Sequence, residues 1–213
     1  MSDARVAAVP VQDCDERLVD VRRGGELLVD AREQGTDAVG AFAHLREGVL
    51  RRLLEAQALL PDGLRLLFVE GYRPPALQRR YFEGYAERLR SVHPDWQDGR
   101  LRSAASRFVS PPEIAPHSAG AAVDLTLADA DGHELDLGTP IDASPEDSEG
   151  ACYTQAPNIG DRARANRTTL AAALTAAGLV NYPTEWWHWS YGDRYWALLT
   201  GAEAARYGPR ELI

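Results

Sequence analysis

Residues 116–127 read PHSAGAAVDLTL, and the second half of this stretch is the clearest indication of the fold. From Ala122 to Leu127 apolar and polar residues alternate, which predicts a strand with one face in the core. Asp124 interrupts this strand on its other face, which it shares with Thr126. A carboxylate in such a place needs a cation or a metal as its partner, so the stretch predicts a sheet and a site together.

Helix and strand patterns fill the rest of the chain without the regular rhythm of a parallel βαβ fold. Helices are expected at residues 38–60, 76–92, 161–178 and 193–200, and further strands at residues 64–72 and within residues 179–191. Long loops are expected at residues 93–118 and 128–160, and a weakly patterned N-terminal extension of uncertain role at residues 1–35. The mixture predicts an α+β fold.

Length and composition indicate a single domain over residues 1–213. The chain is 45% hydrophobic with a net charge of -9 at pH 7, which argues against nonspecific nucleic-acid binding. It shows neither a run of about 18 apolar residues nor a signal-peptide pattern, so a cytoplasmic protein without a membrane span is expected. Cys14 and Cys152 are expected to be reduced thiols, with one long-range disulfide as the alternative in a secreted protein.

A second motif, EWWH at residues 185–188, adds a histidine and a further carboxylate. With His117 and Asp124, His188 gives two imidazoles and one carboxylate, enough for three protein ligands to one zinc ion. Three ligands and an open fourth position are the plan of a catalytic zinc site, whereas structural sites are closed by four. Taken alone, His117 and Asp124 are better explained as a loop histidine and a strand-edge aspartate, and it is the position of Asp124 in an apolar strand that argues against this. The same three ligands also suit other first-row divalent ions.

Glu185 is the carboxylate left over, and it is the candidate base that takes a proton from a metal-bound water. Glu185 and His188 are three residues apart in a tryptophan-rich run that favours a strand. Because strand side chains alternate, we expect Glu185 at an irregular entry to the strand and His188 inside it. The alternative is an aromatic core strand with an incidental histidine.

Arg73 and Asp142 are two further candidates. Arg73 closes the strand expected at residues 64–72, where a guanidinium would stabilise an oxyanion, although a surface salt bridge explains Arg73 alone about as well. Asp142 ends the segment GTPID, and a fixed carboxylate there would recognise a substrate ammonium. The acidic residues at 146–149 are interpreted as a solvated loop.

Together these residues resemble the zinc D-alanyl-D-alanine dipeptidases of the VanX type. The matching blocks, in the family's order, are GYRP at residues 71–74, HSAGAAVDLTL at residues 117–127, GTPID at residues 138–142 and EWWH at residues 185–188. The resemblance covers about residues 60–195. It implies an antiparallel sheet flanked by helices with zinc in a cleft, as in D-Ala-D-Ala carboxypeptidases and the signalling domain of Hedgehog.

Carried over by motif, the resemblance implies one zinc ion per chain. His117, Asp124 and His188 would bind it. Glu185 would be the general base, and Arg73 would stabilise the transition state.

The resemblance also implies a small substrate pocket. Asp142 would meet the free amino group of the substrate, and Trp186 and Trp187 would help to wall the pocket. The sequence departs from the family pattern in two places that bear on which dipeptide fits. Ala115 and Pro116 occupy positions where the family usually has serines. The family usually has a tyrosine near its pocket in the N-terminal part of the chain, whereas residues 20–45 contain no tyrosine.

The expected activity is zinc-dependent hydrolysis of D-Ala-D-Ala or a related D,D-dipeptide, with a small dipeptide as the only expected partner. One alternative is a carboxypeptidase that trims peptidoglycan peptides; it would act outside the membrane, where a leader or anchor is expected. The other is a zinc-containing binding module without catalysis. Glu185 and Arg73 argue against that module, because pure binding needs no base. The residues predict no oligomeric state.

Overall fold

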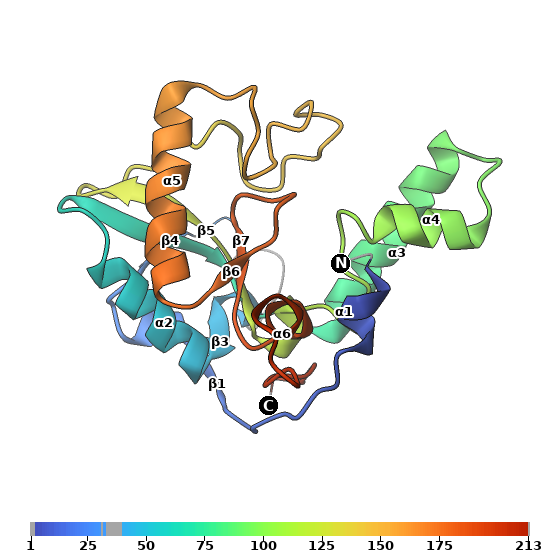
Figure 1. The fold of residues 1–213 in the computed structure, drawn as a ribbon, viewed down its shortest axis with the longest axis horizontal. Helices are drawn as coiled ribbons and strands as arrows, with labels where there is room; N and C mark the ends of the chain where they lie inside the picture. The colour runs from blue at the N-terminus through green and yellow to red at the C-terminus, as the bar shows by residue number, and fades with distance from the viewer. Residues whose placement is uncertain (1–2, 31, 33–39, 213) are drawn as a thin grey trace.

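Helices flank a central sheet in an α+β fold, and a helical hairpin formed by α3 and α4 projects from one side (Figure 1). The computed structural model describes residues 3–30, 32 and 40–212. The sheet has five strands in the order β2-β4-β5-β7-β6. These are β2 (Leu28–Val29), β4 (Leu64–Glu70), β5 (Ala122–Asp129), β7 (His188–Ser190) and β6 (Val180–Asn181).

The pairing of the sheet is mixed rather than antiparallel throughout. β4, β5, β7 and β6 are antiparallel neighbours, as the family resemblance implied. β2 differs because it pairs with β4 in parallel. The connection between these two strands contains a helix, α2 (Glu47–Ala58), and such a crossover returns the chain to the same end of the sheet.

The helices are α1 (Ala4–Ala8), α2 (Glu47–Ala58), α3 (Pro75–Val92), α4 (Asp98–Ala105), α5 (Asp161–Ala176) and α6 (Arg194–Thr200). α3, α5 and α6 lie where the apolar periodicity predicted them. The helix expected at residues 38–60 begins only at Glu47, because a 3-10 turn (Ala41–Ala43) and β3 (His44–Arg46) precede it, while residues 38 and 39 lie outside the described residues.

The segment 93–118 is not the uninterrupted loop that was expected, because it contains α4. Leu101 and Ala105, one helical turn apart, are the buried residues of this short helix. Asp98 in its first turn complements the helix dipole. The Pro, Ser and Gly residues around α4 favoured the prediction of a loop, and an apolar face of only two residues was too short to indicate a helix.

The N-terminal extension is bound to the rest of the molecule. β1 (Leu18–Asp20) pairs with β3 (His44–Arg46) in a two-stranded antiparallel sheet. The guanidinium of Arg46 is fully buried, 2.8 Å from the carboxylate of Asp13 and 2.8 Å from the carbonyl of Ala119. The extension is thereby fixed to the segment that follows His117.

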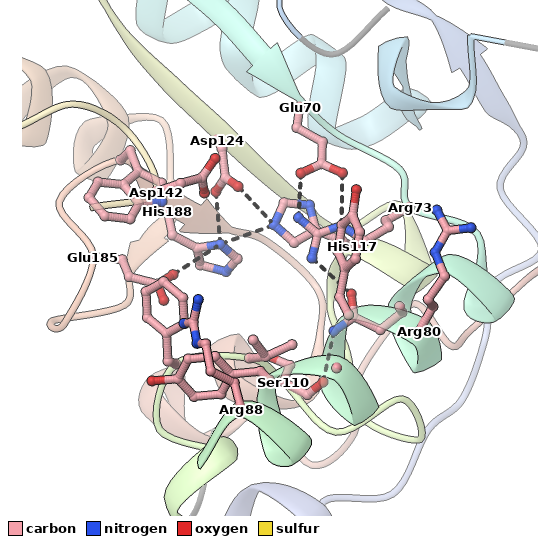
Figure 2. A pocket seen from close by; sticks show the side chains of 17 residues that line it. Glu70, Arg73, Arg80, Arg88, Ser110, His117, Asp124, Asp142, Glu185 and His188 are labelled. Carbon is pink, nitrogen blue, oxygen red and sulfur yellow. Dashed lines mark hydrogen bonds and ion pairs between the residues drawn. The ribbon is translucent and has the colours of Figure 1, made fainter. Parts of the chain in front are cut away.

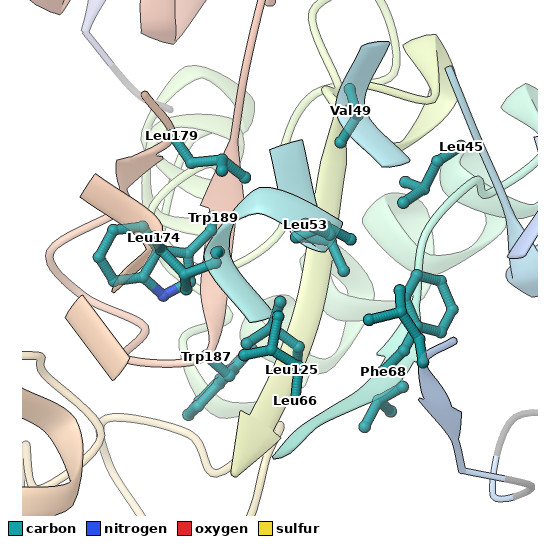
Figure 3. Close-up of a cluster of buried hydrophobic side chains, with 14 of the residues drawn as sticks. Leu45, Val49, Leu53, Leu66, Phe68, Leu125, Leu174, Leu179, Trp187 and Trp189 are labelled. Atoms are coloured by element: carbon teal, nitrogen blue, oxygen red, sulfur yellow. The ribbon is translucent and has the colours of Figure 1, made fainter. Parts of the chain in front are cut away.

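The main core lies between the sheet and the helices α2 and α5 (Figure 3). Leu53 of α2 and Leu174 of α5 meet Leu66 of β4 and Leu125 of β5 in this core. Fully burying one such side chain contributes roughly 1.5–3 kcal/mol. Since Leu125 faces this layer, its neighbour Asp124 lies on the opposite face of β5, as the alternation predicted.

Two further observations concern the chain as a whole. In the part of the chain that the structure describes, no helix is both long and apolar enough to cross a bilayer. Cys14 is exposed, Cys152 is buried, and both are free thiols, as expected.

Candidate metal centre and active site

Three neighbouring strands place Glu70, Asp124 and His188 in one row across the sheet. The register pairs Glu70 with Asp124, and Asp124 with His188. Directly opposite residues on antiparallel strands present their side chains on the same face. The sheet therefore gathers two carboxylates and an imidazole from three distant parts of the sequence.

His117 reaches this row from the turn that enters β5. It begins a 3-10 turn (His117–Ala119) that Gly120 ends with a φ of 64°. A Cβ at Gly120 would lie 2.3 Å from a methyl group of Leu18, so the turn requires glycine. The Nδ1 of His117 lies 2.5 Å from the carbonyl oxygen of Gly71, which can only accept a hydrogen bond. Nδ1 therefore carries a proton, and Nε2, on the other side of the ring, is the nitrogen that can turn a lone pair toward a metal.

The three predicted metal ligands converge (Figure 2). The Nε2 of His117 lies 3.2 Å from the Nδ1 of His188 and 3.3 Å from one oxygen of Asp124. The other oxygen of Asp124 is 2.9 Å from the Nδ1 of His188. Ligand atoms around a tetrahedral zinc ion, with bonds of about 2.0–2.2 Å, are about 3.3–3.6 Å apart. The donor set and its spacing therefore fit one zinc ion with an open fourth position.

The charges of this cluster suit metal binding. Burial opposes ionisation of Asp124, but the imidazoles of His117 and His188 hold its pKa well below the usual range. Burial lowers the pKa of His188, against the opposing effect of Asp124. Burial also acts to lower the pKa of His117, but the charge of Asp124 outweighs it and raises that pKa above the ordinary value. Asp124 and His188 thus favour the forms that coordinate metals, whereas His117 gives up a proton when a metal binds.

Glu185 lies in the turn immediately before β7, and His188 is the first residue of that strand, as the sequence predicted. One carboxylate oxygen of Glu185 is 3.9 Å from the Nδ1 of His188. Burial raises the pKa of Glu185 well above its usual range, and the charges of Asp124 and Asp142 raise it further. A carboxyl group whose pKa is raised in this way is suited to exchanging a proton near neutral pH.

Arg73 is held by a carboxylate that the sequence interpretation missed. Its Nε donates to Glu70 at 2.8 Å, a terminal nitrogen donates to the other Glu70 oxygen, and the second terminal nitrogen donates to Gln78 at 3.0 Å. Burial acts against the charge of Arg73, yet Glu70 keeps its pKa above the ordinary value. The sequence signal was present, because Glu70 ends an apolar strand just as Asp124 interrupts one.

One cavity of about 570 Å³ joins these groups. The predicted residues that line it are His117, Asp124, His188, Glu185, Arg73, Asp142 and Trp187. The facing wall is formed partly by α3, through Tyr81, Tyr85 and Arg88. These three residues are spaced at four and three positions, which places them on one helical face.

Trp186 does not line this cavity, contrary to the expectation. Its ring is 2% exposed, and its indole N–H donates to the hydroxyl of Thr139 at 2.8 Å. Its two neighbours in the sequence, Glu185 and Trp187, do line the cavity. Trp186 lies in the turn before β7, and its side chain packs in the main core.

Comparison with known families agrees with this site. A family model described as D-ala-D-ala dipeptidase, peptidase M15, matches residues 40–200. The chain belongs to this family of metallopeptidases. It is 30% identical to a D-alanyl-D-alanine dipeptidase of Synechocystis sp. over 216 residues, covering 89% of this chain and 87% of the relative. It is 32% identical to a D-alanyl-D-alanine dipeptidase of Escherichia coli over 127 residues, covering 60% of this chain and 55% of the relative.

Among solved structures, the protein is similar to VanYB in complex with D-Alanine-D-Alanine. The TM-score is 0.43 and the sequence identity 15%, over 74% of this chain and 78% of the other.

In this member of the peptidase family, a buried arginine holds the loop that contains Asp142 in place through hydrogen bonds. Arg167 of α5 donates to the carbonyls of Leu137 at 2.7 Å, Ala151 at 2.8 Å and Tyr153 at 2.7 Å. These carbonyls lie on both sides of Asp142 in the chain. Asp142 has a φ of 64°, a conformation that residues other than glycine adopt rarely and that the surrounding contacts must maintain.

The cavity of this peptidase also has tyrosines that motif matching did not assign. Residues 20–45 contain no tyrosine, but Tyr81 and Tyr85 line the cavity from α3. Their helical spacing was visible in the sequence, whereas the fact that α3 faces the candidate metal ligands was not.

Proposed function

We propose that the protein hydrolyses D-Ala-D-Ala or a closely related D,D-dipeptide with one zinc ion per chain. The observation that carries this proposal is the convergence of His117, Asp124 and His188, at 2.9–3.3 Å, in the cavity that Glu185 and Arg73 also line. Membership of the dipeptidase family supports the same reaction. We therefore favour a dipeptidase over a binding module, which needs neither a base nor an oxyanion donor.

His117, Asp124 and His188 would hold the zinc ion. When bound, zinc supplies a Lewis acid that polarises the scissile carbonyl and lowers the pKa of an attacking water. The Gly71 carbonyl fixes the ring of His117, so the ligands are oriented before the metal arrives.

Glu185 would move the proton. Its carboxylate accepts a proton from the attacking water and returns it to the leaving amine. Burial makes Glu185 a stronger base than an exposed glutamate, because the charged form loses hydration.

Arg73 would donate to the carbonyl oxygen as negative charge develops there. Glu70 and Gln78 hold three of its nitrogens in place, so little reorganisation is needed during the reaction. Removing one such donor costs on the order of 10²–10³ in rate.

Asp142 would accept hydrogen bonds from the free ammonium of the substrate, with Trp187 forming an apolar part of the wall. A carboxylate at this position favours a substrate with a free amino end and disfavours an acylated one. This feature argues for a dipeptidase over a carboxypeptidase that trims longer peptides.

The test is amino-acid release from D-Ala-D-Ala, L-Ala-L-Ala and N-acetyl-D-Ala-D-Ala, with zinc and with a chelator. We expect chelator-sensitive release from D-Ala-D-Ala alone, abolished in Glu185→Ala. Glu83→Ala is the matched control, since Glu83 is exposed on α3 outside the cavity. Cleavage of the acetylated peptide would favour the carboxypeptidase, and zinc binding without cleavage of any substrate would favour the binding module. The cytoplasmic location stays a prediction, tested by cell fractionation.

A further inference from the structure

The proposed mechanism leaves two cations of the cavity, Arg80 and Arg88, without a role. Arg88 of α3 lines the cavity together with the metal ligands and Glu185. Figure 2 shows it on the α3 side of the cavity, across from Asp142. Arg73 is paired with Glu70, whereas no carboxylate of the described residues forms an ion pair with Arg88.

Arg88 is supported by an aromatic ring. Its guanidinium lies 4.7 Å from the ring centre of Tyr85, one turn earlier on the same helix. The Tyr85 side chain also hydrogen-bonds Arg88. The remaining N–H groups of the guanidinium can donate to a planar anion such as a carboxylate. A side chain held in this way also loses less conformational freedom when it binds a ligand.

Arg88 also stands where the active-site cavity meets a second cavity. The second cavity, of about 450 Å³, shares Tyr85, Arg88 and Phe108 with the first. Glu146 and Asp147 line it beyond Arg88. A substrate carboxylate is therefore attracted at Arg88 and repelled farther along, which fixes where the carboxyl end of a substrate stops.

We propose that Arg88 binds the C-terminal carboxylate of the dipeptide, opposite the ammonium that Asp142 receives. This inference rests on the proposed dipeptidase function and extends it to substrate length. A dipeptide carries its two charges at its two ends, so two fixed opposite charges in the cavity select a zwitterion of that length. A peptide that continues beyond its second residue has no carboxylate to place at Arg88.

The test compares D-Ala-D-Ala with its C-terminal amide in wild type and in Arg88→Gln. We expect the variant to lose about 10- to 100-fold in kcat/KM for the acid, mainly through KM, because hydrogen bonds between charged groups are the strong ones. The variant should hydrolyse the amide as the wild type does. Arg79→Gln, exposed on the same helix and outside the cavity, should leave both substrates unaffected.

A binding measurement separates this inference from the proposed reaction. Calorimetric titration of the acid and the amide into Glu185→Gln, with and without Arg88→Gln, needs no turnover. If Arg88→Gln weakens binding of the acid but not of the amide, the inference is supported, even if the wild type hydrolyses neither compound. Absence of hydrolysis by the wild type would count only against the proposed dipeptidase activity. Equal losses of binding for the acid and the amide would show that Arg88 has a structural role, and would overturn the inference. The inference would also be overturned if Arg80→Gln, a change in the other α3 arginine of the cavity, lost binding of the acid alone while Arg88→Gln did not.

Discussion

Glu70 binds the guanidinium of Arg73 with both of its carboxylate oxygens, and the two side chains are largely buried together. Glu70 is also the cross-strand partner of Asp124. The sheet thus fixes the candidate oxyanion donor by the same pairing that fixes a candidate metal ligand. A donor held in this way is in position before the substrate arrives.

Glu70→Gln should lower kcat/KM for D-Ala-D-Ala by about 10- to 100-fold, less than complete loss of the oxyanion donor. The amide keeps the shape of the side chain but removes its charge and one acceptor, so Arg73 is held less firmly. Steady-state kinetics and metal analysis are the measurements, and zinc content should not change. Glu83→Gln serves as the control, and wild-type kinetics in Glu70→Gln would contradict the role given to this pair.

Asp124→Asn should weaken zinc affinity by more than about 100-fold, because the ligand loses its charge between two imidazoles. Competition against a chromogenic chelator measures the affinity. Asp131→Asn is a matched control in a second cluster, Asp129, Asp131 and His133, which is largely exposed. If Asp131→Asn lost the metal and Asp124→Asn kept it, the metal centre would be wrongly assigned.

Removing the metal should lower the melting temperature by about 8–16 °C. A ligand present at about 1,000 times its Kd stabilises the folded state by about 4 kcal/mol, and each kcal/mol shifts the melting temperature of a chain of this size by about 2–4 °C. Differential scanning calorimetry with and without a chelator measures the shift. The Asp124→Asn protein should show almost none, and an equal shift in that variant would mean that the chelator acts elsewhere.

Arg167→Met should destabilise the fold by at least about 3 kcal/mol, since three buried carbonyls lose their donor at about 1–3 kcal/mol each. Burial lowers the pKa of Arg167 to about 10, so the side chain remains charged at neutral pH. KM should also rise, because the loop that carries Asp142 is held less firmly. Urea unfolding and kinetics are the measurements. Arg162→Met, exposed on the same helix, should stay within about 0.5 kcal/mol of wild type.

The sequence predicted the parts of this protein that depend on local pattern. Alternation at residues 122–127 identified the strand β5 and placed Asp124 away from the core, and helical spacing located α3 and α5. The candidate metal ligands were recognisable because a carboxylate in an apolar strand and a histidine close to a glutamate are rarely left without partners. These features can be read locally because each depends on neighbours within a few residues.

Some predictions failed because the deciding contact was not local. The parallel pairing of β2 depends on a crossover that contains α2, and the start of α2 depends on the pairing of residues 44–46 with β1. The place of Trp186 in the core depends on the hydroxyl of Thr139 and on the layer behind the strand. Alternation indicates that neighbouring side chains diverge, but only the assembled layers decide which of the two sides is the core.

The sequence by itself therefore determined which chemical groups are available: a carboxylate and two imidazoles that suit a metal, a glutamate that suits a base, and an arginine. The tertiary structure decided which groups act together. The register of β4, β5 and β7 brings Glu70 beside Asp124 and His188, and the packing of α3 turns Arg88 toward them. Register and packing arise from contacts between segments that are far apart in the chain, and these contacts form only when the chain folds.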